Sequence, residues 1–277
     1  MDAQTDSLRL ADSHCHLDDR QFAPDRTEVI ERAQEAGVRY LLAIGTGDGP
    51  PDLEAGVRLA DEYPFIYATV GIHPNDAAKA GPDTFRRLEK LLRHPKVKAM
   101  GEIGLDYHWD VPKEKQIPVF REQLALAAEV RLPAVIHTRD AWSDTLHELK
   151  RHWVPTGLPC LMHCFTGDAG MARECLDLGF YLAFGGVTTF PKSQTIREAT
   201  LATPIERMLL ETDAPYLAPV PHRGKRNEPA YVAHTAKAIA AMRGIPPEEL
   251  AGKTTMNFEL LFGIGQEEPL KNTQQLH

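Results

Sequence analysis

The sequence predicts a closed (β/α)8 barrel of the TIM type, and three observations support this fold class. The chain has 277 residues, and a single α/β barrel of about 250 residues would use nearly all of it. Eight short apolar runs alternate with amphipathic stretches, which is the pattern of parallel βαβ units. Polar residues follow several of the runs, as expected at one end of a barrel. An open, doubly wound sheet is the alternative, and the number of runs favours the barrel.

The apolar runs give the expected strands in order. The candidate strands are residues 8–13, 40–44, 65–70, 97–103, 133–136, 160–162, 180–184 and 207–210. Between them, apolar residues recur at helical spacing, as Phe120, Leu124 and Ala127 do. Two more helices are expected after the last strand, near residues 231–242 and 247–261.

Composition limits the class of protein. The chain is 43% hydrophobic and 25% charged, which is typical of a globular protein and excludes a disordered, collagen-like or coiled-coil chain. Its net charge of −8 argues against nucleic-acid binding by the bulk surface, so a phosphate-binding site needs a local basic patch or bound cations. We expect one barrel domain over residues 1–265 and a polar tail over residues 266–277.

The expected location is the cytoplasm. The four cysteines form no CxxC pair, and the polar N-terminus does not resemble a signal peptide. No apolar stretch approaches the length of a membrane span, so no membrane association is expected. Nothing in the sequence indicates an obligate protein partner.

Histidines and carboxylates follow five of the predicted strands, where barrel enzymes place their chemistry. The residues are His14, His16, Glu102, Asp106, His137, His163 and Asp213. Side chains two residues apart on a strand share a face, so His14 and His16 can bind one cation together. Four histidines and two carboxylates are more ligands than one tetrahedral ion can take. They suit two divalent cations that share a bridging carboxylate.

Each of these residues also has a simpler interpretation. A His-x-His pair is common on surfaces and in cores, and His137 or His163 could be a hydrogen-bonded core histidine. Glu102 could be a salt-bridged loop residue, and Asp213 could cap a helix. Their shared placement after predicted strands favours one site, because buried imidazoles and carboxylates are costly without a cation.

Several motifs, in order along the chain, resemble those of the TatD family of metal-dependent hydrolases. The motifs are His14-Cys15-His16, Gly71-Ile72-His73-Pro74, Gly101-Glu102-Ile103-Gly104-Leu105-Asp106, His137-Thr138-Arg139, His163-Cys164-Phe165-Thr166-Gly167 and Glu211-Thr212-Asp213-Ala214-Pro215-Tyr216-Leu217, followed by residues 223–229. The resemblance covers about residues 12–262. It implies a metal-dependent barrel of the amidohydrolase superfamily, with deoxyribonuclease activity in some members. Asn75 stands where many relatives carry a histidine.

The resemblance also implies a role for each ligand. The expected metal ligands are His14, His16, Glu102, His137, His163 and Asp213. The first two histidines would bind one metal and the last two the other, while Glu102 would bridge both. Asp213 would ligate the first metal and contact the attacking water, so Glu102 and Asp213 are the expected catalytic residues. The metals could be Mg²⁺, Mn²⁺, Zn²⁺ or Ni²⁺.

The expected reaction is hydrolysis of phosphodiester bonds by a water activated between the two cations, in the manner of a 3'-5' exonuclease acting on nucleic acid or oligonucleotide ends. The candidate substrate-binding residues are His73, Arg139, Arg223 and Arg226. An ester or amide hydrolase using the same site is the main alternative, and a non-catalytic binding protein is a further one.

Residues near these motifs have expected supporting roles. Asp12 and Glu211 each precede an expected ligand by two residues and should form supporting hydrogen bonds. Trp109, Phe165 and Tyr216 could stack on a nucleobase or pack in the core or rim. Asp106 should support its loop rather than bind metal.

Overall fold

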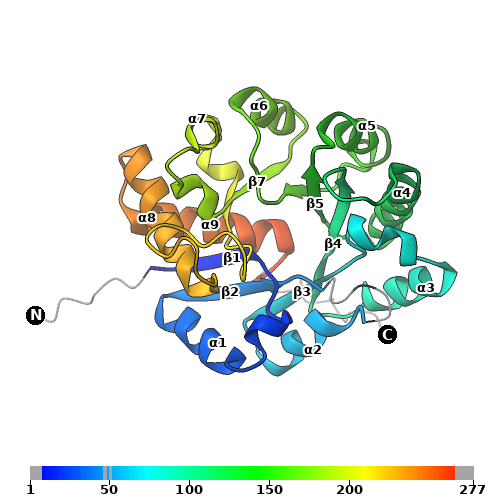
Figure 1. The fold of residues 1–277 in the computed structure, drawn as a ribbon, viewed down its shortest axis with the longest axis horizontal. Coiled ribbons are helices and arrows are strands. Elements are labelled where there is room, and N and C mark those ends of the chain that lie inside the picture. The colour runs from blue at the N-terminus through cyan, green and yellow to red at the C-terminus, as the bar shows by residue number, and fades with distance from the viewer. Residues whose placement is uncertain (1–7, 46–48, 50–51, 266–277) are drawn as a thin grey trace, which may run out of the picture.

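Eight parallel strands form one sheet in chain order, from β1 to β8 (Figure 1). The computed structural model describes residues 8–45, 49 and 52–265. The strands are β1 (Leu10–Cys15), β2 (Val38–Ala43), β3 (Ile66–Val70), β4 (Val97–Asp106), β5 (Ala134–Arg139), β6 (Cys160–Met162), β7 (Tyr181–Phe184) and β8 (Met208–Leu210). Close to the end of β1, the Asp213 amide donates to the His14 carbonyl at 2.9 Å, joining the last segment to the first strand. The predicted eight-stranded barrel is confirmed.

Helices surround the strands, one following each strand and α9 after α8 (Figure 1). The α-helices are α1 (Arg26–Glu35), α2 (Ala55–Glu62), α3 (Pro82–Leu91), α4 (Lys113–Val130), α5 (Trp142–His152), α6 (Ala169–Asp177), α7 (Gln194–Ala202), α8 (Val232–Arg243) and α9 (Pro247–Phe262). The last two end at Gly244 and Gly263, both at positive φ, a conformation that glycine adopts without steric cost. The expected tail at 266–277 lies outside the described residues. None of the helices in the described part of the chain has the combination of length and apolar composition that a bilayer crossing requires.

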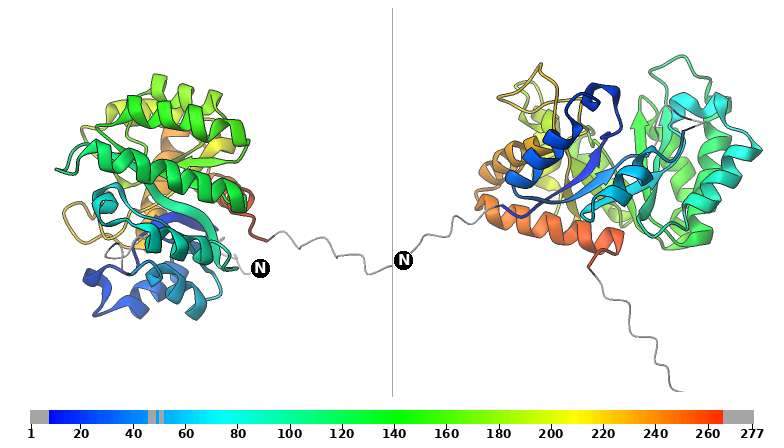
Figure 2. Two further views of the ribbon diagram at one scale, coloured as in Figure 1. Left: turned by 90° about the vertical axis from the view of Figure 1, so that its right-hand side faces the viewer. Right: turned by 90° about the horizontal axis from the view of Figure 1, so that it is seen from below.

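The N-terminal end of the barrel is filled with apolar side chains. The inner cluster takes residues from the strands, among them Ala11, Leu42, Ala99, Val135, Leu161, Ala183 and Leu209. α9 covers this end and adds Phe258 and Phe262 to the same cluster. In Figure 2, right, α9 lies along one edge of the molecule, and the loops that follow β1 and β8 lie at the opposite edge. This closure leaves the C-terminal end of the barrel for the site.

Shifts in strand register orient the side chains of two site residues toward the inside of the barrel. The register of β1 against β2 shifts between Asp12 and Cys15, and the register of β4 against β5 shifts between Met100 and Ile103. A bulge of this kind re-aims the side chains that follow it. His14 and Glu102 each lie three residues after an inward-facing alanine, yet both reach the interior. Simple alternation along the strands would have pointed them outward.

Candidate metal centre

A cavity of about 1440 Å³ opens at the C-terminal end of the barrel. Its lining includes the sequence-predicted residues His16, His73, Glu102, His137, Arg139, His163 and Asp213. His14 is fully buried at its floor, beside Glu102. The structure therefore brings all six expected metal ligands together around one point.

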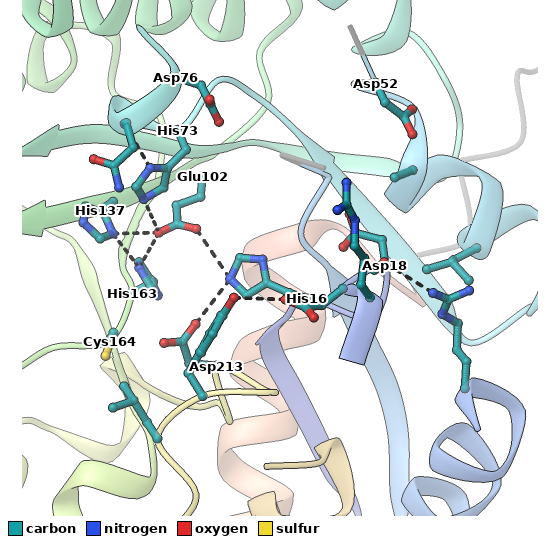
Figure 3. A pocket seen from close by; sticks show the side chains of 18 of the residues that line it. His16, Asp18, Asp52, His73, Asp76, Glu102, His137, His163, Cys164 and Asp213 are labelled. Atoms are coloured by element: carbon teal, nitrogen blue, oxygen red, sulfur yellow. Dashed lines mark hydrogen bonds and ion pairs between the residues drawn. The ribbon is translucent and has the colours of Figure 1, made fainter. Parts of the chain in front are cut away.

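Glu102 lies at the centre of this group, with its two oxygens facing different histidine pairs (Figure 3). Its Oε2 lies 3.3 Å from His14 Nε2 and 3.8 Å from His16 Nε2. Its Oε1 lies 2.7 Å from His137 Nδ1 and 2.9 Å from His163 Nε2. A carboxylate in this position can bridge two cations, one on each oxygen.

Asp213 belongs to the first histidine pair. Its Oδ1 lies 3.4 Å from His16 Nε2 and 3.7 Å from His14 Nε2. Asp213 follows β8 and has a positive φ of 56°. Its backbone is fixed on both sides, because its amide donates to His14 and its carbonyl accepts from the Tyr216 amide. This fixed backbone directs the carboxylate toward the pair and toward the cavity.

Two further carboxylates lie behind the second histidine pair. Asp106 Oδ2 lies 3.2 Å from His137 Nε2, and Asp106 Oδ1 accepts from the His108 amide. Glu211 Oε1 accepts from the Cys164 amide at 2.7 Å, while its Oε2 lies 3.8 Å from His163 Nδ1. Carboxylates behind metal-binding imidazoles orient the rings and fix their tautomers. Glu211 thus forms its expected supporting hydrogen bond with the Cys164 amide, and Asp106 supports its loop through the His108 amide while also contacting His137.

Burial and mutual charge set the ionisation of the group. Burial raises the pKa of the Glu102 carboxyl, but the surrounding imidazoles, His163 first, bring that pKa well below its ordinary value. Burial also raises the pKa of Asp213. The hydrogen bond with His16 and the charge of nearby imidazoles have a larger effect, so the pKa is lowered overall. Burial lowers the pKa of His14 to about 4, which leaves this ring neutral and able to donate a lone pair.

The donor set fits divalent cations. Both ring nitrogens of His14 are buried without a hydrogen bond, as are His163 Nδ1 and Glu211 Oε2. Unpaired buried polar atoms are costly, and a cation would compensate for those facing the carboxylates. Ligands about 2.1 Å from a tetrahedral ion lie about 3.4 Å apart, close to the separations around His14 and His16. Residues His14, His16 and Glu102 form one candidate metal cluster, and Glu102, His137 and His163 form another.

Comparison with known proteins decides the family. The model of the TatD-related DNase family matches residues 11–263. The chain belongs to the TatD family. It is accordingly a metal-dependent hydrolase, as the sequence motifs predicted, and the structure shows the clusters that could bind the metal.

TatD relatives match over nearly their full length. An uncharacterized metal-dependent hydrolase of Bacillus subtilis, YabD, is 44% identical over 92% of this chain and 99% of its own. The protein named 3'-5' ssDNA/RNA exonuclease TatD of Klebsiella pneumoniae is 38% identical over 92% of this chain and 98% of its own. Among solved structures, the TatD homolog YJJV of Escherichia coli superposes with a TM-score of 0.84 at 31% identity, covering 92% of this chain and 98% of that one.

The predicted substrate-binding residues fall into two groups in this TatD chain. His73 and Arg139 line the cavity. Arg223 and Arg226 are not among the residues that line it, and their substrate-binding role stays a prediction. Arg223 lies over the Phe190 ring, 4.8 Å from its centre. Arg226 is held at 2.7 Å by each Asp25 oxygen, so its guanidinium is engaged in a structural ion pair.

Asp12 forms the supporting hydrogen bonds expected of it, but to the backbone: its carboxylate accepts from the His14 amide and from the amide and hydroxyl of Thr212. It therefore joins β1 to the segment after β8. Of the two roles expected for Phe165, the structure shows core packing, because the side chain is only 4% exposed and packs on Phe184.

Sequence reasoning missed two supporting glutamines on α4. The Gln123 side chain accepts from the Ile72 amide at 2.6 Å and donates to the Ile72 carbonyl, next to His73. The Gln116 side chain likewise accepts from the Asp106 amide and donates to the Asp106 carbonyl. A signal was present, because both glutamines lie on the helix face that carries Phe120 and Leu124. Polar side chains on a buried helix face need partners.

Proposed function

We propose that the chain hydrolyses phosphodiester bonds at the ends of single-stranded nucleic acid, as a 3'-5' exonuclease. The observation that carries this proposal is the placement of Glu102, whose two oxygens face separate histidine pairs. The relative named as a 3'-5' ssDNA/RNA exonuclease supports the choice of substrate. The net charge of −8 favours short fragments and strand ends, since long duplexes bind through extended positive surfaces.

The proposed cofactors are two divalent cations. His14, His16, Asp213 and Glu102 Oε2 would hold the first, and His137, His163 and Glu102 Oε1 the second. Mg²⁺, Mn²⁺, Zn²⁺ and Ni²⁺ all accept this mixture of imidazole and carboxylate ligands. Two such cations lower the pKa of water toward neutrality and offset the charge on phosphoryl oxygens during in-line displacement.

The protein's own residues supply proton transfer and substrate orientation. Asp213 is ionised because its pKa is lowered, so its carboxylate can accept the proton of the attacking water. His73 Nδ1 accepts from the Asn75 amide at 3.1 Å, so the neutral ring carries its proton on Nε2. That N–H lies beside Glu102, at 3.6 Å from Oε1, and can donate to a phosphoryl oxygen. Arg139, at the exposed end of β5, can bind a second phosphate oxygen.

We also propose that the chain works in a reducing, cytosolic compartment. All four of its cysteines are free thiols. Burial raises the pKa of each one, Cys15, Cys160, Cys164 and Cys175, which keeps them in the unreactive thiol form.

Digestion of end-labelled substrates tests the proposal. Single-stranded DNA and RNA of one sequence are incubated with the protein and each of the four metals in turn. A ladder of products shortened from the 3' end is the expected result, and the Asp213→Asn variant should give none. Internal cuts, or turnover of simple ester and lactone substrates alone, would overturn the exonuclease assignment.

A further inference from the structure

Two large aromatic side chains are exposed among the described residues, and both line the cavity. Trp109, in the segment between β4 and α4, is 55% exposed, and Tyr216, after β8, is 49% exposed. Large aromatic rings usually bury most of their apolar faces. Two exposed rings at the mouth of one polar site therefore provide flat apolar surface where a substrate must pass.

The two rings lie on different sides of Glu102. The Tyr216 ring centre is 5.9 Å from that of His16, on the side of Oε2. Trp109 lies 5.9 Å from the Arg139 guanidinium, and Arg139 follows His137 by two residues on β5, on the side of Oε1. A phosphodiester group centred on Glu102 would thus have one ring near each of its two nucleosides.

Both rings are already oriented by neighbouring side chains. The Tyr216 hydroxyl donates to Asp19 Oδ2 at 3.0 Å. The Trp109 indole makes an edge contact with His108, with ring centres 5.1 Å apart, and the Arg139 guanidinium lies over it. A ring that is held in place loses little conformational entropy when a base stacks on it, which favours binding.

We propose that Trp109 and Tyr216 form an aromatic clamp that stacks on the two nucleobases flanking the scissile phosphate. The proposal rests on the proposed nuclease function and adds the feature that recognises the bases. Stacking accepts every base, because each has a π-face, so the clamp imposes little sequence preference. A base within a duplex has its faces covered by its neighbours, so the clamp selects unpaired ends.

Binding measurements test the clamp without relying on turnover. The probes are a thymidine pentanucleotide with hydrolysis-resistant phosphorothioate linkages and a matched pentanucleotide with abasic sugars at its two 3'-terminal positions. Titrated against the Mn²⁺-loaded protein by calorimetry, the wild type should bind the thymidine probe about 10-fold or more tightly than the abasic probe. The thymidine probe should also quench tryptophan fluorescence, and the Trp109→Phe variant should lose that quenching.

Variants divide the effect between the rings. Trp109→Ala and Tyr216→Ala should each reduce the preference for the thymidine probe several-fold. Trp109→Phe should retain part of it, and Tyr216→Phe should retain most, since the ring remains and only the hydrogen bond to Asp19 is lost. In steady-state digestion, both alanine variants should raise KM with kcat nearly unchanged, because stacking acts equally on the bound substrate and the transition state.

The outcomes separate this inference from the function on which it rests. Met256→Ala, at a 52% exposed residue of α9 at the other end of the barrel, is the matched control and should keep the full preference. A wild-type protein that digests single strands but binds both probes equally would overturn the clamp alone. A wild-type protein that digests no oligonucleotide would overturn the nuclease function and the clamp with it.

Discussion

At the N-terminal end of the barrel the strands enclose apolar side chains under α9, whereas at the C-terminal end the same strands carry imidazoles and carboxylates around an open cavity. Both ends are built from neighbouring residues of the same strands, such as Ala11 and His14 on β1. The change from one environment to the other occurs at the register shifts of β1 and β4. The apolar core and the candidate metal centre thereby occupy opposite ends of one sheet.

The two ends differ in what burial does to stability. Apolar burial near Phe258 stabilises the fold at about 25 cal/mol per Å². At the C-terminal end, burial works against charged groups: it raises the pKa of Asp12 to about 8 and also raises that of Glu211. The metal-free C-terminal end therefore costs stability, which the N-terminal end offsets. Predictions that alter one end alone test this division.

The largest expected effect is the loss of turnover in Glu102→Gln. A neutral amide cannot bridge two cations, and loss of several kcal/mol of transition-state stabilisation corresponds to a decrease in kcat of about 10³-fold. Metal content measured by elemental analysis should fall in parallel. The melting temperature without metal should fall, because the surrounding imidazoles lower the pKa of Glu102 and so stabilise its charge, and the neutral amide loses that stabilisation. Near-normal kcat would contradict the bridging role.

At the other end of the barrel, Phe258→Ala should lose stability without losing turnover. The side chain is fully buried and stacks on Tyr40 with ring centres 5.8 Å apart, so its removal should cost about 3–5 kcal/mol of unfolding free energy. Urea denaturation measures this loss, and kcat of the folded fraction should be unchanged. Met256→Ala, on the exposed face of the same helix, should change stability little. A fall in kcat as large as that of Glu102→Gln would show that the two ends are coupled.

Metal removal should affect both properties at once, because the proposed ions would bind only the folded C-terminal end. Chelation should abolish turnover and lower the melting temperature, and Mn²⁺ at about 100 times its dissociation constant should restore about 2.7 kcal/mol of stability. Differential scanning fluorimetry across a Mn²⁺ titration measures the gain. The Glu102→Gln variant serves as the control and should gain much less. An equal gain in that variant would place the stabilising ion elsewhere.

The two ends also differ in how far the sequence predicted them. The apolar runs predicted every strand to within a few residues, since burial pattern is a local property. The histidines and carboxylates were identified because they follow those runs, and the ordered motifs predicted the family. The contacts of Arg226 with Asp25 join residues far apart in the chain, so local charge density could not reveal this ion pair. The register shifts that turn His14 and Glu102 inward leave no local pattern, because they depend on pairing with β2 and β5.

A smaller effect is expected from Gln123→Leu, which tests how α4 supports the site. Leucine fits the apolar helix face, but it leaves the amide and carbonyl of Ile72 without their partner. An unpaired buried group costs about 1–3 kcal/mol, so unfolding free energy should fall by that amount. Because His73 follows Ile72 directly, KM for the oligonucleotide should rise as well. Gln123→Glu keeps an acceptor for the Ile72 amide, so its unfolding free energy and its KM should lie closer to those of wild type. An equal KM in the leucine variant and wild type would show that Gln123 does not position His73.

The smallest effect is expected from Arg226→Gln, outside the cavity. The hydrogen bond from Arg226 lowers the pKa of Asp25 from 3.8 to about 2. A lowered folded-state pKa gives stability that is complete above the unfolded value and is lost as pH falls through the folded value. The melting temperature of wild type should therefore fall more steeply between about pH 4 and pH 2 than that of the variant. The difference should be small, because both side chains are partly exposed. KM for the oligonucleotide should not change in Arg226→Gln, whereas Arg139→Gln should raise it. A matching rise of KM in Arg226→Gln would indicate that Arg226 contacts the substrate.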